Sequence, residues 1–352
     1  MNLAKYAAKR FILTIPTLFA VSLIIFYTTT FFSPRERLQL YVSSSRYYNP
    51  WAPDETAELI AKYHINDTFF AQFTAWLREV LTGNLGYCHL YNLPVSEVIL
   101  NGFSATLELI MFAVPIILLG GYKLGVLSAR RAHERAGKED VVDFTVRSVS
   151  ILGYSIPQFC VALLLLVVFY MFLGWFGPGR LGSASQMIVY SPEWTHYTGL
   201  YTVDALLNGQ LDVFIDVLKH LVLPVITLTV SLLPIIIRIT RSGMLEELVK
   251  PYVITAKAKG LDENAVIKRA GRNSLTSVLT VSGILLASML TGVIVTENVF
   301  LINGAGSLIV KAALQHDYAL LVGFSLVFFL IFTFINLAVD ITCAYINPRI
   351  SR

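Results

Sequence analysis

The sequence predicts an all-helical integral membrane protein with six membrane-spanning helices and both termini on one side of the bilayer. Of its 352 residues, 55% are hydrophobic and only 14% are charged, whereas soluble domains carry about 25% charged residues. Six apolar runs are long enough, or nearly long enough, to cross a bilayer. The Lys and Arg residues gather in alternate segments between these runs, which is the pattern that sets the orientation of membrane proteins.

The first apolar run covers residues 11–32 and follows Lys5, Lys9 and Arg10. It is longer than the core of a signal peptide and lacks a small-x-small cleavage site, so we expect a retained membrane helix. Residues 33–102 are polar and rich in aromatic side chains. Within them, residues 54–63 and 69–81 have the apolar periodicity of amphipathic helices. This segment is expected to form an external insertion after the first helix.

The other five runs contain few charges and several small residues. Glu108, Glu297 and Asp340 stand at span ends, where an acid is a functional candidate by default. Each is also close enough to an interface to be solvated or to cap a neighbouring helix. Gly121-x-x-x-Gly125 predicts close helix packing in the second span, and small residues repeat in the fifth. The five expected spans cover residues 105–129, 148–176, 221–237, 274–296 and 319–339.

The basic residues indicate which side of the membrane each loop occupies. Segments assigned to the inside hold about twice as many Lys and Arg residues as the longer outside segments. Both termini and the loop between the fourth and fifth spans are therefore expected in the cytoplasm. The net charge of +4 follows from this orientation, so it does not indicate a nucleic-acid-binding surface.

That loop, residues 243–272, contains the signals of a short helix. Pro251 suits its first position, where a missing N–H costs nothing, and Gly260 suits a left-handed C-terminal cap. Lys257 and Lys259 fall near its end, where cations complement the helix dipole. The helix would be roughly nine residues, about 13 Å long, and Asp262 is a suitable N-cap for a second helix. Residues 243–272 are therefore either a rigid docking element for another protein or an ordinary basic loop.

The residues of this loop resemble the coupling-loop (EAA-type) motif of permease subunits in ABC importers, and the match is best with the oligopeptide/dipeptide/nickel permease family. Arg269 departs from the histidine that is usual in the family, and Ser277 departs from a usual proline. The matching residues are Arg241, Met244, Tyr252, Val253, Thr255, Ala256, Ala258, Lys259, Gly260, Leu261, Val266, Arg272 and Asn273.

In that family the short helix inserts into a cleft on the ATP-binding subunit. The resemblance therefore implies a cytoplasmic coupling loop over residues 243–273 and a coupling role for the helix and its end. It also implies that the fifth span lines the pore, where small and hydroxyl side chains leave width. The implied coupling residues are Tyr252, Thr255, Ala256, Lys257, Ala258, Lys259, Gly260 and Leu261; the pore-lining candidates are Ser282, Ser288, Thr291 and Gly292.

The resemblance extends over roughly residues 11–349 and includes the external insertion, residues 33–102, where the match is good at residues 83–87. It implies a single permease domain over residues 1–352, with the architecture of a type I ABC importer in the cell membrane. The usual Pro-Gly-Asp-Pro after the first helix is absent, and residues 33–36 read Ser-Pro-Arg-Glu.

The same resemblance implies the partners of the chain. These are a second homologous permease subunit, two cytoplasmic ATP-binding subunits, an external substrate-binding protein and the lipid bilayer. The chain would be a non-catalytic subunit without a cofactor, and ATP and Mg would bind to the partner ATPase subunits. Within the family the cargo is a peptide, an oligosaccharide or nickel, and the sequence does not decide among them.

Two other classes of function were compared with this one. A secondary transporter would need broken helices, charges deep in the spans or inverted halves, and none of these is visible in the sequence. A polytopic enzyme would need a catalytic constellation, but the chain has no GxxxxGK[ST] and no GxSxG motif. The histidines form no HExxH, and the three cysteines form no CxxC, so no metal site is predicted.

Overall fold

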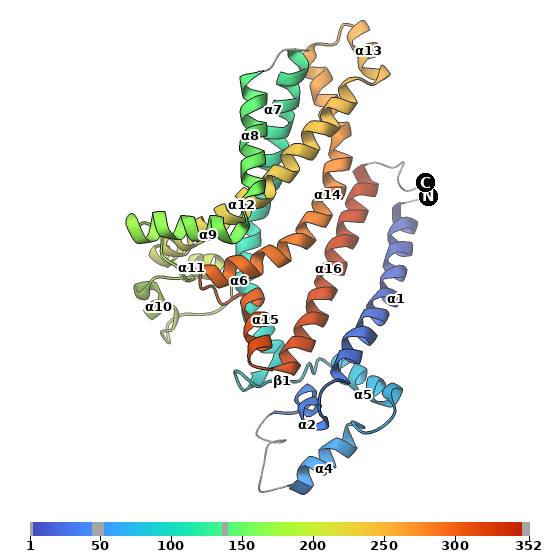
Figure 1. The fold of residues 1–352 in the computed structure, drawn as a ribbon, viewed down its shortest axis with the longest axis vertical. Helices are drawn as coiled ribbons and strands as arrows, with labels where there is room; N and C mark the ends of the chain where they lie inside the picture. The colour runs from blue at the N-terminus through green and yellow to red at the C-terminus, as the bar shows by residue number, and fades with distance from the viewer. Residues whose placement is uncertain (1–2, 44–52, 136–139, 347–352) are drawn as a thin grey trace. The chain divides into compact units, whose positions relative to one another are not determined.

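The computed structural model describes residues 3–43, 53–135 and 140–346, which are mostly helical, as the sequence predicts (Figure 1). The helices divide between two compact units. Unit 1 contains residues 1–6, 107–302 and 335–352, and unit 2 contains residues 7–106 and 303–334. Tyr47, Tyr48 and Trp51 of the aromatic insertion, Lys138 of the inside cations, and Arg349 and Arg352 near the C-terminus lie outside the described residues.

Unit 2 holds the external insertion and parts of three long helices. Helices are observed at Pro53–Lys62 and Phe69–Leu81, which confirms the two amphipathic helices expected there. A short antiparallel hairpin pairs Tyr87 with Pro94 and Cys88 with Leu93. The elements in or entering this unit are α1 (Leu3–Thr29), α2 (Pro34–Arg37), η1 (Leu38–Leu40), α4 (Pro53–Lys62), α5 (Phe69–Leu81), β1 (Tyr87–Cys88), β2 (Leu93–Pro94), α6 (Val95–Pro115), α15 (Ala305–Leu314) and α16 (Tyr318–Ile346).

The aromatic residues of the insertion mainly build the core of unit 2. Phe73 and Trp76 of α5 are 2% exposed, and both pack against Phe26 of α1. The ring of Tyr41 stacks on that of Tyr63 with 4.4 Å between centroids. Such rings bury large apolar areas, so their abundance in residues 33–102 is explained by packing.

A buried carboxylate joins the hairpin to α16 within the same unit. Asp317 is fully buried and accepts hydrogen bonds from the backbone N–H groups of Leu90 and Leu320, each at 3.0 Å. It also lies beside Cys88. Burial first, and the carboxylate second, raise the pKa of the Cys88 thiol to about 12. Cys88 therefore remains a protonated thiol at neutral pH, with low reactivity toward thiol reagents.

Unit 1 is organised around one long helix, α12 (Leu211–Leu248), which packs against α7, α8, α9, α11 and α14. The elements in or entering this unit are α6, η2 (Ile116–Gly120), α7 (Gly121–Glu134), α8 (Val141–Ser155), α9 (Gln158–Leu165), η3 (Leu166–Phe172), α10 (Ser183–Val189), α11 (Tyr201–Leu207), α12, α13 (Pro251–Ala258), α14 (Glu263–Val299) and α16.

Two glycines allow α7 to lie directly on α12. A Cβ atom on Gly121 would be 2.6 Å from the Cβ of Ile236, and one on Gly125 would be 2.5 Å from the Cβ of Thr240. No side chain can occupy such positions without moving a backbone. The Gly121-x-x-x-Gly125 pattern is therefore a helix-packing motif, as its spacing predicts.

The expected third span is not one straight helix. It divides into α8 and α9–η3, whose axes differ by 96°. The break falls at Ile156 and Pro157, because a residue before proline is driven out of the helical region, and Ile156 has φ −84° and ψ 125°. The prediction that no span is broken was wrong, because Pro157 keeps Ile156 out of the helical conformation and interrupts the span.

Within the described part of the chain, four helices are long and apolar enough to cross a membrane, and a fifth crossing results if α8 and α9–η3 count as one span. The four cover Lys5–Thr29, Val95–Glu134, Leu211–Leu248 and Tyr318–Tyr345. The expected fifth span, residues 274–296, lies inside the continuous helix α14. The chain is therefore a helical multi-pass membrane protein, and the number six stays a prediction.

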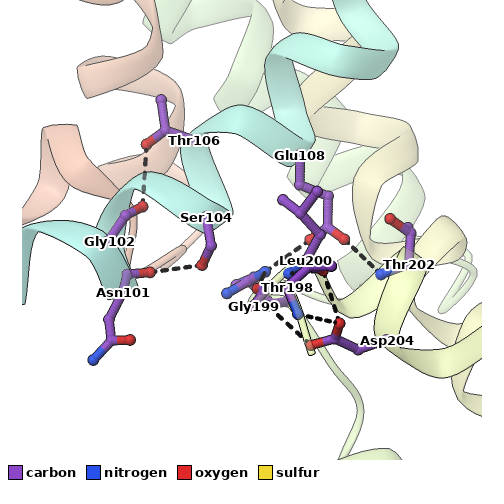
Figure 2. A network of polar contacts seen from close by, with 11 residues as sticks. Asn101, Gly102, Ser104, Thr106, Glu108, Thr198, Gly199, Leu200, Thr202 and Asp204 are labelled. Atoms are coloured by element: carbon purple, nitrogen blue, oxygen red, sulfur yellow. Dashed lines mark hydrogen bonds and ion pairs between the residues drawn. The ribbon is translucent and has the colours of Figure 1, made fainter. Parts of the chain in front are cut away.

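A network of buried charges connects α6 with the segment that contains α10 and α11 (Figure 2). Glu108 is 1% exposed; its carboxylate pairs with Arg180 at 2.9 Å and accepts the backbone N–H of Thr202 at 2.7 Å. The guanidinium of Arg180 also lies 3.9 Å from the ring centroid of Tyr201. In the same segment Asp204 is fully buried and accepts bonds from the backbone N–H groups of residues 198 and 199.

These contacts give Glu108 a structural role, so Glu108→Gln is expected to destabilise the protein. The amide cannot neutralise Arg180, and breaking a buried ion pair on one side costs about 3 kcal/mol. Thermal unfolding of the purified protein in detergent should show a lower midpoint. Glu193→Gln is the matched control, because Glu193 is exposed in the same segment. Equal midpoints for the two variants would contradict the structural role.

Candidate functional site

The short helix expected in the loop between the fourth and fifth spans is present as α13. It begins at Pro251 and ends at Ala258, one residue shorter than the roughly nine expected. Gly260 has φ +75°, in the left-handed region, as the sequence predicts. Its N–H bonds to Lys257 O at 2.9 Å and the Leu261 N–H to Ala256 O at 3.2 Å. These two bonds form a Schellman cap, which ends the helix and turns the chain.

The helix that follows α13 also begins as predicted. Asp262 accepts a hydrogen bond from the Ala265 N–H at 2.7 Å and caps the N-terminus of α14. Only three residues separate the last residue of α13 from this cap. A short turn held by these hydrogen bonds thus joins the two helices, and it fixes the direction of α14 relative to α13.

One face of α13 is packed against the other helices at this end of unit 1. Val253 is 2% exposed and Ala256 5% exposed. They belong to a buried apolar cluster to which α7, α12 and α14 contribute, and Tyr252 and Leu261 pack on its edge. The other buried members of this cluster are Ala129, Met244, Leu248, Val266, Ile267 and Ala270.

The opposite face of α13 is exposed. Ile254 has 68% of its surface accessible. Sequence reasoning did not select Ile254, although it lies one turn from Ala258 and so shares its face. Of the expected coupling residues, Ala256 points inward, and Tyr252 and Leu261 are half-buried. The exposed ones are Thr255, Lys257, Ala258, Lys259 and Gly260.

A polar contact holds α13 at its N-terminal end. The Tyr252 hydroxyl donates to the Glu247 carboxylate at 2.8 Å, and the Lys250 ammonium contacts the same carboxylate. Burial first, and the hydrogen bond to Glu247 second, raise the pKa of Tyr252. The hydroxyl therefore remains a proton donor at neutral pH. At the other end, Lys257 Nζ lies 3.5 Å from His133 Nε2 of α7.

A second polar contact joins the helices that support α13. Asp143 of α8 pairs with Arg241 of α12 through two bonds, at 2.7 and 2.8 Å. Ser128 of α7 donates to the same carboxylate. Two parallel bonds between a guanidinium and a carboxylate form a strong, directional pair. Three helices thus converge on one buried carboxylate close to the base of α13.

The structure describes the local environment of only two of the four pore-lining candidates on α14, Ser282 and Gly292. Ser282 is buried and donates to Val278 O, and a Cβ on Gly292 would meet Gln158 Oε1 at 2.9 Å. Gln158, just after the break in the third span, donates to Gly292 O and Thr296 Oγ1, both at 2.7 Å. The side chains of Ser288 and Thr291 lie outside the described residues. The pore-lining role of the four residues stays a prediction.

Other kinds of chemistry find little support outside α13. Among residues 3–43, 53–135 and 140–346, no three His, Cys, Asp or Glu side chains gather in a way that could hold a metal ion. Glu297 is fully buried and, like Asp340, takes part in a polar interaction. The exposed face of α13 on its packed base is therefore the candidate functional site.

Comparison with known proteins gives this geometry a context. Residues 121–352 match the model of the family described as binding-protein-dependent transport system inner membrane component. The chain belongs to this family. The match covers α7 to the C-terminus and so includes α13 and its supports. The permease is thus a multi-pass inner-membrane component of a transport system that works with other subunits.

Curated relatives resemble the permease over nearly its whole length. A dipeptide transport system permease protein of Alkalihalophilus pseudofirmus is 32% identical over 98% of both chains. A probable D,D-dipeptide transport system permease protein of Escherichia coli is 36% identical over 82% of both chains. An oligopeptide transport system permease protein of Bacillus subtilis is 29% identical over 99% of both. The resemblance to ABC importer permeases is therefore confirmed.

We expect Tyr252→Phe to loosen α13 without unfolding the permease. The change removes one hydrogen bond, which is worth about 1 kcal/mol net and corresponds to about a fivefold loss of protection from amide exchange. Hydrogen-exchange mass spectrometry of residues 251–258 measures this. Tyr197→Phe is the control, because Tyr197 is exposed elsewhere in the chain. Unchanged protection of α13 in the Tyr252 variant would contradict the bracing role of the hydroxyl.

Proposed function

We propose that the permease forms half of the translocation pore of an ATP-driven importer of peptides and that α13 couples it to a cytoplasmic ATPase. The observation that carries the coupling role is the exposed face of α13 on a rigid, buried base. A partner that binds this face can move α12 and α14 with it, because α13 is joined to both by short corners. Peptides are favoured as cargo because the three relatives above are named for dipeptides or oligopeptides.

The proposed architecture is that of a type I importer permease with six membrane helices. Residues 1–352 form one permease domain, residues 33–102 the external insertion, and residues 243–273 the cytoplasmic coupling loop. The distribution of Lys and Arg supports this arrangement. The four clear spans and the bent pair are compatible with it when α14 is counted as the remaining span.

The proposed topology predicts that Lys257→Cys reacts with a membrane-impermeant maleimide only when the reagent reaches the cytoplasmic face. Lys257 is exposed on α13, so a thiol there is accessible. The native cysteines give a low background, because Cys88 and Cys343 are buried. The wild-type chain measures the contribution of Cys160. Labelling of residue 257 in intact cells from the outside would contradict the proposed topology.

The proposed partners follow from the division of labour in an ABC importer. A second homologous permease completes the pore, two ATP-binding subunits hold ATP and Mg, and an external binding protein delivers the substrate. The permease itself is a non-catalytic subunit. On α14, the residues proposed to line the pore are Ser282, Ser288, Thr291 and Gly292.

The function is tested by ATP-dependent peptide uptake into proteoliposomes that contain the permease, a second permease subunit and the ATP-binding subunits, with the external binding protein added. Gly260→Val is expected to abolish uptake and weaken co-purification of the ATPase. The left-handed conformation of Gly260 is costly for a β-branched residue, by about 1–2 kcal/mol. The substitution therefore changes how α13 ends and leaves the spans intact.

Gly260→Asn is the matched control, because asparagine tolerates the left-handed region. A Cβ at this position meets no neighbouring atom within 4 Å, so both variants test the backbone and not a clash. The asparagine variant should retain most uptake and ATPase binding. Wild-type coupling in the valine variant would remove Gly260 from the coupling role. Uptake by the permease alone, without ATP-binding subunits, would overturn the proposed function.

A further inference from the structure

A cavity of about 520 Å³ opens between α8 and α12 in unit 1. We name it the arginine cavity, because Arg147 of α8 and Arg238 and Arg241 of α12 line it. Its volume is within the range of sites that bind small molecules. It is separate from the exposed face of α13 and from the pore-lining candidates on α14.

The charges around the arginine cavity are not balanced. Arg241 forms an ion pair with Asp143, and Arg147 Nη1 lies 4.0 Å from the same carboxylate. Arg238 is exposed, and among the described residues no carboxylate lies within ion-pair distance of it. Two of the three guanidinium groups thus share the Asp143 carboxylate, Arg238 has no carboxylate near it in the described part of the chain, and the cavity has an excess of positive charge.

The two ends of the arginine cavity differ in chemistry. Asp143 of α8 pairs with Arg241 of α12, and Gly153, further along α8, faces Val230 and Pro234, earlier in α12, so the two helices run antiparallel. The arginines therefore lie toward the end of unit 1 that carries α13. Ile151 and Tyr154 lie nearer the break in the third span and are each 63% exposed. Along α8 the rise from Arg147 is about 6 Å to Ile151 and about 10 Å to Tyr154, which separates a cationic end from an apolar end.

This arrangement matches one class of molecule. A phospholipid carries an anionic phosphate and apolar chains in the same order, and basic pockets between membrane helices are suited to anionic headgroups. A soluble anion would use the arginines and leave Ile151 and Tyr154 exposed. By length and composition α12 can cross a membrane, and α8 belongs to the bent pair that counts as a fifth crossing, so a lipid can reach a cavity between them.

We propose that the arginine cavity binds the headgroup of an anionic phospholipid, with Arg238 on the phosphate and Ile151 and Tyr154 against the acyl chains. The lipid would bridge α8 and α12 close to the base of α13. The proposal rests on the proposed topology only for the choice of the cytoplasmic leaflet, and it does not depend on the transport activity.

The test uses the full chain purified in mild detergent and titrated with phosphatidylglycerol or with phosphatidylcholine of the same acyl chains. Native mass spectrometry measures the bound lipid. The wild type should bind phosphatidylglycerol preferentially. Arg238→Gln should weaken that binding about fivefold, which corresponds to the roughly 1 kcal/mol contributed by one basic residue at an anionic membrane surface. Arg238→Lys should retain most of it, because the charge remains.

Lys268→Gln is the matched control, because Lys268 is an exposed cation of the same unit that does not line the cavity. It should bind phosphatidylglycerol like the wild type. Equal binding of the two lipids, or wild-type binding by Arg238→Gln, would overturn the proposal. Displacement of phosphatidylglycerol by equimolar inorganic phosphate would identify a soluble-anion site instead.

A final arm compares the chain alone with the complex that contains a second permease subunit. Phosphatidylglycerol retained in the complex supports the proposal, whereas its loss on assembly means that the partner protein occupies the cavity. Because bound lipid is measured without transport, a failure of peptide uptake counts against the proposed function alone. Loss of lipid selectivity counts against the arginine cavity alone.

Discussion

The arrangement of unit 1 depends on how closely α7 approaches α12. Gly121 and Gly125 remove the side chains that would otherwise separate the two helices, and the backbone of α7 lies against Ile236 and Thr240. In a membrane the hydrophobic effect does not drive helices together, so close van der Waals contact between small residues has to supply the attraction. Overpacking of such a contact costs roughly 1–3 kcal/mol. A larger residue at either glycine would displace α12, on which the neighbouring helices pack.

The close contact also explains why α13 has a rigid base. With α7 and α12 in register, Ala129 and Met244 meet in the same apolar cluster that receives Val253 of α13. The pair of Asp143 with Arg241 then adds α8 to the same end. A force applied to the exposed face of α13 would therefore reach several helices together, as the proposed coupling role requires.

Two buried carboxylates of the permease are paired with arginines. Glu108 with Arg180, and Asp143 with Arg241, satisfy the principle that a charge removed from water needs a partner. The excess of positive charge at Arg238 departs from this balance, and the proposed anionic lipid would supply the missing charge. A polar contact also follows the break at Pro157. Gln158, the next residue, donates a hydrogen bond to Gly292 O on the backbone of α14.

The sequence alone determined the helical membrane class, the two amphipathic helices of the insertion and the local geometry of α13, including Pro251 at its start and Gly260 at its end. These features depend on hydrophobic periodicity or on contacts within a few residues, so their signals are local. Only the tertiary structure decided that Ala256 faces inward while Ile254 is exposed, since this depends on α7, α12 and α14 together. It also decided the pairing of Glu108 with Arg180, 72 residues away. Such contacts join segments whose distance in the chain carries no signal of their proximity in space.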